Sequence, residues 1–183
     1  MIILEIIGVL FGLIYVVGAV FEKSWCWPAG IIGVSIYGIS MYKAGIYGES
    51  MLQSLYILIS IYGWRNWVNK INEKPEIITK TSFHEFLLVV FSSFVFTYLF
   101  WVLLTYFESN LPFWDAITNG FAIGATYLVA RKKIENWILW IFIDITLSVI
   151  LFLKGFYFYS GLYIVYTFIA IFGWKQWEKK ISK

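Results

Sequence analysis

Residues 137–144 read WILWIFID and place one carboxylate inside an apolar run that extends from Ile134 to Leu153. On an α-helix, Trp137, Trp140 and Asp144 are spaced i, i+3, i+7 and therefore share one face. A carboxylate at the centre of a bilayer costs about 2.5–3.5 kcal/mol on insertion scales, so it is expected to face protein or a watery cavity. We predict a buried helical face that carries two indole rings beside a carboxylate.

The composition predicts an integral membrane protein, because 61% of the 183 residues are hydrophobic and only 14% are charged. The formal charge of +3 is small and dispersed, which argues against nucleic-acid binding. No glycine-rich phosphate loop or nucleophile–base arrangement is present, so we expect no enzyme activity, no catalytic residue and no cofactor. The single cysteine, Cys26, excludes an internal disulfide, and no metal site is expected.

Seven apolar runs approach the length of about 20 residues that crosses a bilayer, which predicts an all-α protein with seven transmembrane helices. The longest hydrophilic stretch follows the third run and marks a boundary. We divide the chain into a first three-helix unit (1–68), a linker plus a linking helix (69–111), and a second three-helix unit with a basic tail (112–183). The runs cover approximately residues 2–21, 27–42, 50–68, 85–107, 112–130, 134–153 and 157–174.

Basic residues predict the orientation, because cytoplasmic loops are enriched in lysine and arginine. Seven spans bring nearly all of them to one face, so the carboxyl terminus is expected in the cytoplasm and the amino terminus outside. That face receives Lys23, Arg65, Lys70, Lys74, Lys80, Arg131, Lys132, Lys133, Lys175, Lys179, Lys180 and Lys183, whereas the other receives Lys43 and Lys154.

An internal repeat relates the two ends of the chain at an offset of 110 residues. Residues 5–70 and 115–180 then share 16 identities in 66 pairs, and YGWRNW at 62–67 lies over FGWKQW at 172–177. With seven spans the two repeats enter the membrane from the same side, as in transporters whose substrate binds near the midplane. Gly30 and Val34 take the places of Trp140 and Asp144, so we expect small residues of the second span to leave room for a ligand.

Further polar side chains are predicted to line a cavity in the same region. Gln53 and Tyr56 share a face of the third span, the repeat places Tyr163 and Tyr166 at the corresponding positions, and Asn119 lies in the fifth span. Ordinary interhelical hydrogen bonding, worth about 0.6 kcal/mol on average in membranes, is the alternative interpretation. For the tryptophans the alternative is an aromatic belt at the membrane interface, and for Asp144 it is a carboxylate satisfied by neighbouring hydroxyl groups.

These residues resemble the PnuC family of bacterial vitamin transporters. The pattern Trp137-x2-Trp140-x3-Asp144 is similar to the W-x2-W-x3-[N/D] substrate motif of that family, and Leu52-Gln53-x2-Tyr56 also matches. The resemblance implies a 3+1+3 arrangement of parallel repeats related to SWEET proteins, and facilitated diffusion of a vitamin across the bacterial inner membrane. It also implies a homotrimer and trapping of the vitamin by a cytoplasmic kinase.

The resemblance favours nicotinamide riboside as the substrate, with thiamine or riboflavin as the alternatives. Asp144 stands where nicotinamide riboside carriers often have asparagine. Nicotinamide riboside and thiamine both carry a permanently positive ring that a carboxylate suits, whereas neutral riboflavin gains less. We expect Trp137 and Trp140 to stack on the ring, and Asp144 and Gln53 to bind polar groups. A seven-span sensor of the same ligand and a structural scaffold are the alternatives from other classes.

Overall fold

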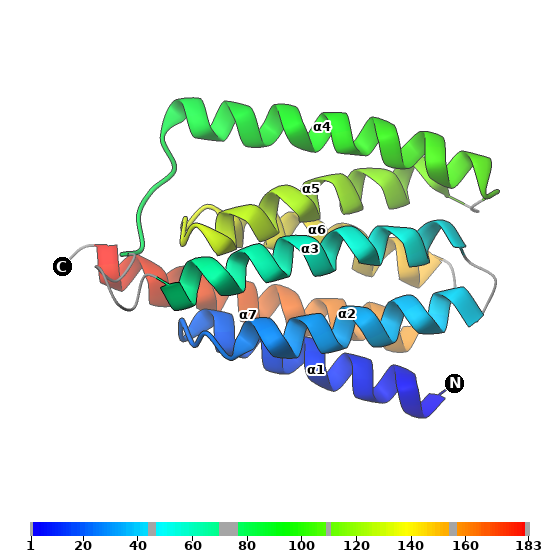
Figure 1. Ribbon diagram of the computed structural model, residues 1–183, viewed down its shortest axis with the longest axis horizontal. Helices are drawn as coiled ribbons and strands as arrows, with labels where there is room; N and C mark the ends of the chain where they lie inside the picture. Colours follow the sequence, from blue (N-terminus) through cyan, green and yellow to red (C-terminus); the bar gives the residue numbers. More distant parts are fainter. Residues whose placement is uncertain (1, 44–46, 70–76, 109–110, 154–156, 182–183) are drawn as a thin grey trace.

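The computed structural model describes residues 2–43, 47–69, 77–108, 111–153 and 157–181, and seven α-helices account for most of them (Figure 1). This confirms the predicted all-α fold with seven helices. Within the described residues, the only β-type pairing is an isolated bridge between Thr79 and Lys133. The helices are α1 (Ile2–Val20), α2 (Cys26–Lys43), α3 (Tyr47–Asn69), α4 (Phe83–Tyr106), α5 (Pro112–Ala130), α6 (Asn136–Leu153) and α7 (Tyr157–Ile181).

Two helices extend beyond their predicted ends by three residues or more. The helix α3 begins at Tyr47, three residues before the apolar run, and α7 continues past Trp174 to Ile181. A hydropathy pattern identifies only the apolar part of a helix. Trp177, in the polar extension of α7, is fully buried and packs that extension against the bundle. The seventh helix therefore continues through the basic segment after Trp174 as far as Ile181.

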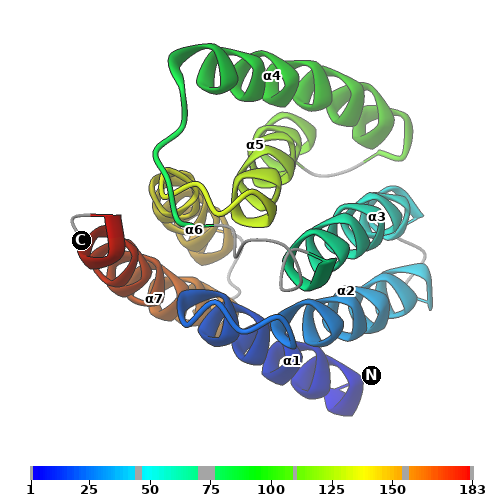
Figure 2. The same cartoon turned by 60° about the vertical axis from the view of Figure 1, so that its left-hand side comes forward.

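The helix α4 lies along α5 on the outside of the bundle (Figures 1 and 2). Ser82 caps its amino terminus by accepting a hydrogen bond from the backbone of Glu85. Close approach to α5 depends on Gly120, since a Cβ there would lie 2.7 Å from the backbone oxygen of Ser93. The opposite face of α4 exposes large apolar side chains such as Leu88 and Phe91, as expected of a surface against lipid.

The first three helices meet the last three along two seams. The helix α3 contacts α5, and α7 contacts α1, while consecutive helices pack as neighbours within each set (Figure 2). The offset of 110 residues relates α1 to α5, α2 to α6 and α3 to α7. The two seams are therefore equivalent contacts, which places the two sets around an approximate two-fold axis.

Four buried tryptophans repeat the same contact in both sets. The rings of Trp27 and Trp67 meet edge to face with centroids 5.4 Å apart, and Trp137 and Trp177 do the same at 5.4 Å. The equivalent glycines of α3 and α7 make room for them, since a Cβ at Gly173 would lie 2.7 Å from the Trp137 ring. Together with smaller apolar side chains they form one core cluster, which we call the tryptophan cluster.

The tryptophan cluster also joins the two sets of helices. Trp67 donates from Nε1 to the backbone oxygen of Ala130 at 3.2 Å, and Trp177 donates to that of Val20 at 3.1 Å. Positions 20 and 130 are equivalent in the repeat, as are positions 67 and 177. Each set of helices therefore donates an equivalent tryptophan hydrogen bond to the other set. These bonds fix the two sets at the level where α1 and α5 end.

An ion-pair network lies beyond the tryptophan cluster. Glu22 and Lys132, which are equivalent in the repeat and both have positive φ, form a salt bridge at 3.0 Å. Lys180 pairs with the same carboxylate, and the Lys132 ammonium group lies 5.0 Å from the centre of the Trp67 ring. We call this end of the bundle, which also carries the start of α4 and the end of α7, the basic end.

The described basic residues segregate as predicted. Those placed by the sequence on the carboxyl-terminal face lie at the basic end, and Lys43 lies at the opposite end. By length and hydropathy alone, α4 and α6 each qualify as membrane-spanning helices among the described residues. The remaining members of the predicted distribution, Lys70, Lys74, Lys154 and Lys183, lie outside the described residues.

The linker after α3 is attached to the loop between α5 and α6. Thr79 exchanges backbone hydrogen bonds with Lys132 and Ile134, both 3.1 Å long. Glu135 accepts from the backbone and the hydroxyl of Thr81, and the side chain of the linker residue Ile78 is buried in the tryptophan cluster. The described part of the linker is thus fixed to the second set of helices.

Candidate functional site

The predicted face of α6 is buried. Trp137 is 1% exposed and Asp144 5% exposed, and Trp140 is half-buried between them, whereas Ile138 and Phe142 point outward. The motif therefore faces protein, as the cost of placing a carboxylate against lipid requires.

Asp144 has aromatic neighbours and no hydrogen-bond partner among the residues that the structure describes. Its carboxylate lies within electrostatic range of the hydroxyl groups of Tyr163 and Tyr166 on α7. It forms no hydrogen bond with any residue that the structure describes. Tyr166 approaches α1 closely, since its hydroxyl would lie 2.8 Å from a Cβ at Gly12. A buried carboxylate in this setting is available to a cationic or hydrogen-bonding ligand.

The oxygen atoms around Asp144 differ from other buried polar atoms. Among the described residues, Nε1 of Trp137 and the hydroxyl of Tyr15 are sealed from solvent and lack a hydrogen-bond partner. The oxygens of Asp144, Tyr163 and Tyr166 are not in that state. Because these oxygens also have no hydrogen-bond partner among the residues that the structure describes, they keep some exposed surface. The polar groups of α6 and α7 are thus open to a further hydrogen-bond partner.

Tyr56 and Asn119 come together at the seam between α3 and α5, whereas Gln53 packs against Gly38 of α2. The Tyr56 hydroxyl lies 3.1 Å from Oδ1 and 3.2 Å from the backbone oxygen of Asn119, and Asn119 donates to the backbone of Asp115 at 2.8 Å. Gln53 is buried one turn away. Tyr56 and Trp140 pack against one apolar cluster, so this group adjoins the Asp144 region. The hydrogen bond between Tyr56 and Asn119 joins α3 to α5, which is the ordinary interhelical role given above as the alternative interpretation of these residues.

Trp137 belongs to the tryptophan cluster. Its ring contacts Trp177 edge to face and covers Gly173, which encloses it in protein. Trp27 occupies the equivalent place in the first set of helices, against Trp67 and Gly63. A shared packing role explains the tryptophan in both halves, and stacking of Trp137 on a ligand stays a prediction.

The space beside Gly30 is filled by protein, so the expectation that small residues of the second span leave room for a ligand is wrong at this position. A Cβ at Gly30 would lie 2.8 Å from the ring of Tyr15 on α1. In the second set, the equivalent positions hold Trp140 and Ala125, which pack together. In the first set the large side chain is Tyr15 of α1 and the small residue is Gly30 of α2. In the second set the small residue is Ala125 of α5 and the large side chain is Trp140 of α6.

Tyr37 on α2 is a neighbour of this region that sequence reasoning missed. Its hydroxyl lies within electrostatic range of Tyr56 and Tyr163. The available signal was its register, because Tyr37 lies one helical turn beyond Val34, the equivalent of Asp144. A tyrosine in an apolar helix is otherwise an ordinary packing or interface residue.

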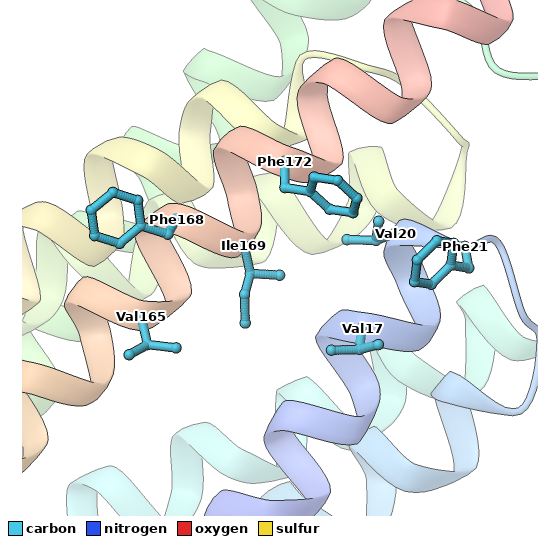
Figure 3. Close-up of a pocket in the computed structure, with 7 residues that line it drawn as sticks. All are labelled: Val17, Val20, Phe21, Val165, Phe168, Ile169 and Phe172. Carbon is cyan, nitrogen blue, oxygen red and sulfur yellow. The ribbon is translucent and has the colours of Figure 1, made fainter.

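A separate groove between α1 and α7 does not suit a polar ligand. Figure 3 shows its walls facing one another, and all of its lining side chains are hydrocarbon. It lacks any group for recognition of a charged or hydroxyl-rich molecule, and it lies along the outer edge of the α1–α7 seam. The lining residues are Val17, Val20, Phe21, Val165, Phe168, Ile169 and Phe172. The described residues also bring no three His, Cys, Asp or Glu side chains together as a metal site.

Comparisons with known proteins match nearly the whole chain. A family model described as nicotinamide mononucleotide transporter matches residues 2–179. The nicotinamide riboside transporter PnuC of Escherichia coli (strain K12) is 28% identical over 201 residues, covering 95% of this chain and 84% of the relative. The riboflavin/roseoflavin transporter RibM of Streptomyces davaonensis is 22% identical, covering 94% and 83%. A crystal structure of the vitamin B3 transporter PnuC superposes with a TM-score of 0.78 and 25% identity, covering 98% of this chain and 82% of that one.

Proposed function

Because the chain belongs to the nicotinamide mononucleotide transporter family, we propose that it takes up nicotinamide riboside by facilitated diffusion and binds it beside Asp144. The observation that carries the proposal is a buried carboxylate that has no hydrogen bond to the described residues and keeps some exposed surface. A permanently positive pyridinium ring supplies the counter-charge, and the half-buried ring of Trp140 offers a face for stacking and cation–π contact.

The other predicted site residues have graded roles in this proposal. Tyr163 and Tyr166 share the electrostatic surroundings of Asp144 and contact the ligand. Tyr56 and Asn119 hold α3 against α5, and Gln53 one turn away supplies an amide to the cavity. Direct contact of Trp137 with the ligand stays a prediction, because this residue is 1% exposed. Trp137 also supports Trp140 from the tryptophan cluster.

Two three-helix units, 1–68 and 112–183, act as the moving halves, and 69–111 links them. The equivalent seams and tryptophan contacts support this division. Movement about the approximate two-fold axis opens the cavity alternately to each side. The basic end is closed by contacts between the halves, and the substrate leaves on that side after those contacts break.

We assign the basic end to the cytoplasm of a bacterial cell, with the protein in the inner membrane and the amino terminus outside. The segregation of lysine and arginine supports this orientation. Since Cys26 is the single cysteine and is buried, new cysteines at Lys179 and Tyr42 report the two sides separately. A membrane-impermeant maleimide added to intact cells should label position 42 and spare position 179; the reverse pattern contradicts the orientation.

Association as a homotrimer and trapping of the vitamin by a cytoplasmic kinase complete the proposal. The exposed apolar face of α4 offers a surface for a second copy or for lipid. Uncoupled diffusion requires a later phosphorylation to retain the substrate. Native mass spectrometry of the purified protein distinguishes a trimer from a monomer.

Calorimetry tests the substrate assignment. Purified protein is titrated with nicotinamide riboside, thiamine and riboflavin, with Asp144→Ala as the site variant and Tyr98→Phe, on the exposed face of α4, as the control. We expect binding of nicotinamide riboside that Asp144→Ala abolishes and Tyr98→Phe leaves unchanged. Tight binding of thiamine or riboflavin without nicotinamide riboside refutes the assignment. Riboflavin is the specific rival, because RibM is among the relatives; a sensor would bind the vitamin without transporting it.

A further inference from the structure

We propose that Tyr37 forms the wall of the ligand cavity on the side away from the basic end and donates a hydrogen bond to a hydroxyl group of the ligand's sugar. This rests on the proposed function, because it assigns the sugar of a nucleoside ligand to one part of the same cavity. No predicted site residue comes from α1 or α2, and Tyr37 supplies a contact from α2.

Helical register gives Tyr37 its height in the bundle. It lies three residues after Val34 and seven after Gly30, on the face of α2 that corresponds to the motif face of α6. Both helices start at the basic end. Tyr37 is therefore one turn further from that end than the level of Asp144, and two turns beyond the level of Trp140.

The neighbours of Tyr37 place its hydroxyl between the two sets of helices. It lies within electrostatic range of Glu49 on α3, Asp115 on α5 and Tyr159 on α7. It also lies within electrostatic range of Tyr56 and Tyr163. A side chain directed at lipid has no such neighbours on three other helices. The Tyr37 side chain thus points toward the centre of the bundle.

Tyr37 is nevertheless 45% exposed, and its hydroxyl forms no hydrogen bond with the residues that the structure describes. Exposure combined with neighbours on three helices is typical of a residue that lines a cavity. The hydroxyls of Tyr163 and Tyr166 likewise lack hydrogen bonds to the described residues. Tyr163 lies within electrostatic range of both Tyr37 and Tyr166 and forms no hydrogen bond with either. A hydroxyl-rich ligand can bridge them.

The arrangement orients the ligand. Seven helical residues separate the level of Trp140 from that of Tyr37, which is about 10 Å along the axis and comparable to the length of a nucleoside. The pyridinium ring then lies at Trp140 and Asp144, and the ribose lies toward Tyr37 and Tyr163. A ligand without ribose makes the first contact and omits the second.

The experiment compares nicotinamide riboside with 1-methylnicotinamide, which keeps the positive pyridinium ring and lacks ribose. Affinities are measured for wild type, Tyr37→Phe and the control Tyr98→Phe, with competition against labelled riboside for the weaker probe. Loss of one neutral hydrogen bond predicts about 5- to 10-fold weaker binding of the riboside by Tyr37→Phe. We expect the affinity for 1-methylnicotinamide to remain unchanged, and Tyr98→Phe to match wild type with both probes.

Two results overturn the inference. If Tyr37→Phe binds the riboside as tightly as wild type, Tyr37 forms no hydrogen bond with the sugar. If Tyr37→Phe weakens the binding of both probes equally, Tyr37 acts on the fold rather than on the sugar. In either case, loss of riboside binding in Asp144→Ala leaves the proposed function standing. If wild type binds no riboside at all, the proposed function fails and the inference fails with it.

Discussion

Gly173→Ala should destabilise the protein, because the new methyl group enters the space of the Trp137 ring. Its Cβ would lie 2.7 Å from Cε2 and 2.8 Å from Cδ2 of Trp137, and a ring clamped against Trp177 has no free rotamer to adopt. Overpacking of this kind costs about 1–3 kcal/mol, which is offset by up to about 1 kcal/mol from the better helix propensity of alanine. At roughly 2–4 °C per kcal/mol for a chain of this size, the melting temperature should fall by several degrees.

The matched control is Gly161→Ala in the same helix, where a Cβ meets nothing within 4 Å. Both variants are purified in detergent and heated while tryptophan fluorescence is followed. The control should melt at or slightly above the wild-type temperature. If Gly173→Ala is as stable as Gly161→Ala, the Trp137 ring has freedom to move and its enclosure in the tryptophan cluster is refuted.

Two further substitutions test contacts at the basic end and between α4 and α5. Burial raises the pKa of Glu22, but the hydrogen bonds and charges of Lys180 and Lys132 outweigh it and lower that pKa below its usual value. The ion pairs therefore stabilise the protein at neutral pH and lose that effect as pH falls through the lowered pKa. The melting temperature of wild type should fall more in acid than that of Glu22→Gln. If melting temperature falls with pH equally in both proteins, this account of Glu22 is contradicted. Gly120→Leu should separate α4 from α5, because its side chain enters the space of Thr97. Faster hydrogen exchange across α4 than in Gly161→Leu is expected, and equal exchange argues against close packing there.

The sequence alone predicted the elements and the buried face of α6, because both follow from local periodicity. Apolar runs long enough to span a membrane predict the helices. The spacing of Trp137, Trp140 and Asp144 predicts which face of α6 is buried. The repeat at 110 residues correctly indicated equivalent positions, and Trp27 and Trp137 make the same contacts in the structure. The polar end of α7 was not predicted, since burial of Trp177 depends on helices distant in sequence.

Features that depend on contacts between helices were not predictable in the same way. Gly30 was interpreted as space for a ligand, but Tyr15 of the preceding helix fills it. Whether a small residue leaves a cavity depends on the side chain opposite, which a single sequence does not show. Tyr37 was missed for the same reason, since its neighbours come from α3, α5 and α7.

Counterflow of labelled nicotinamide riboside tests the central claim most directly. Vesicles containing the purified protein are loaded with unlabelled riboside and diluted into a trace of labelled riboside. Wild type should accumulate label transiently, and Asp144→Ala, reconstituted to the same density and folded by the same melting test, should not. Absence of counterflow in wild type, or equal counterflow in Asp144→Ala, would contradict a transport site at Asp144.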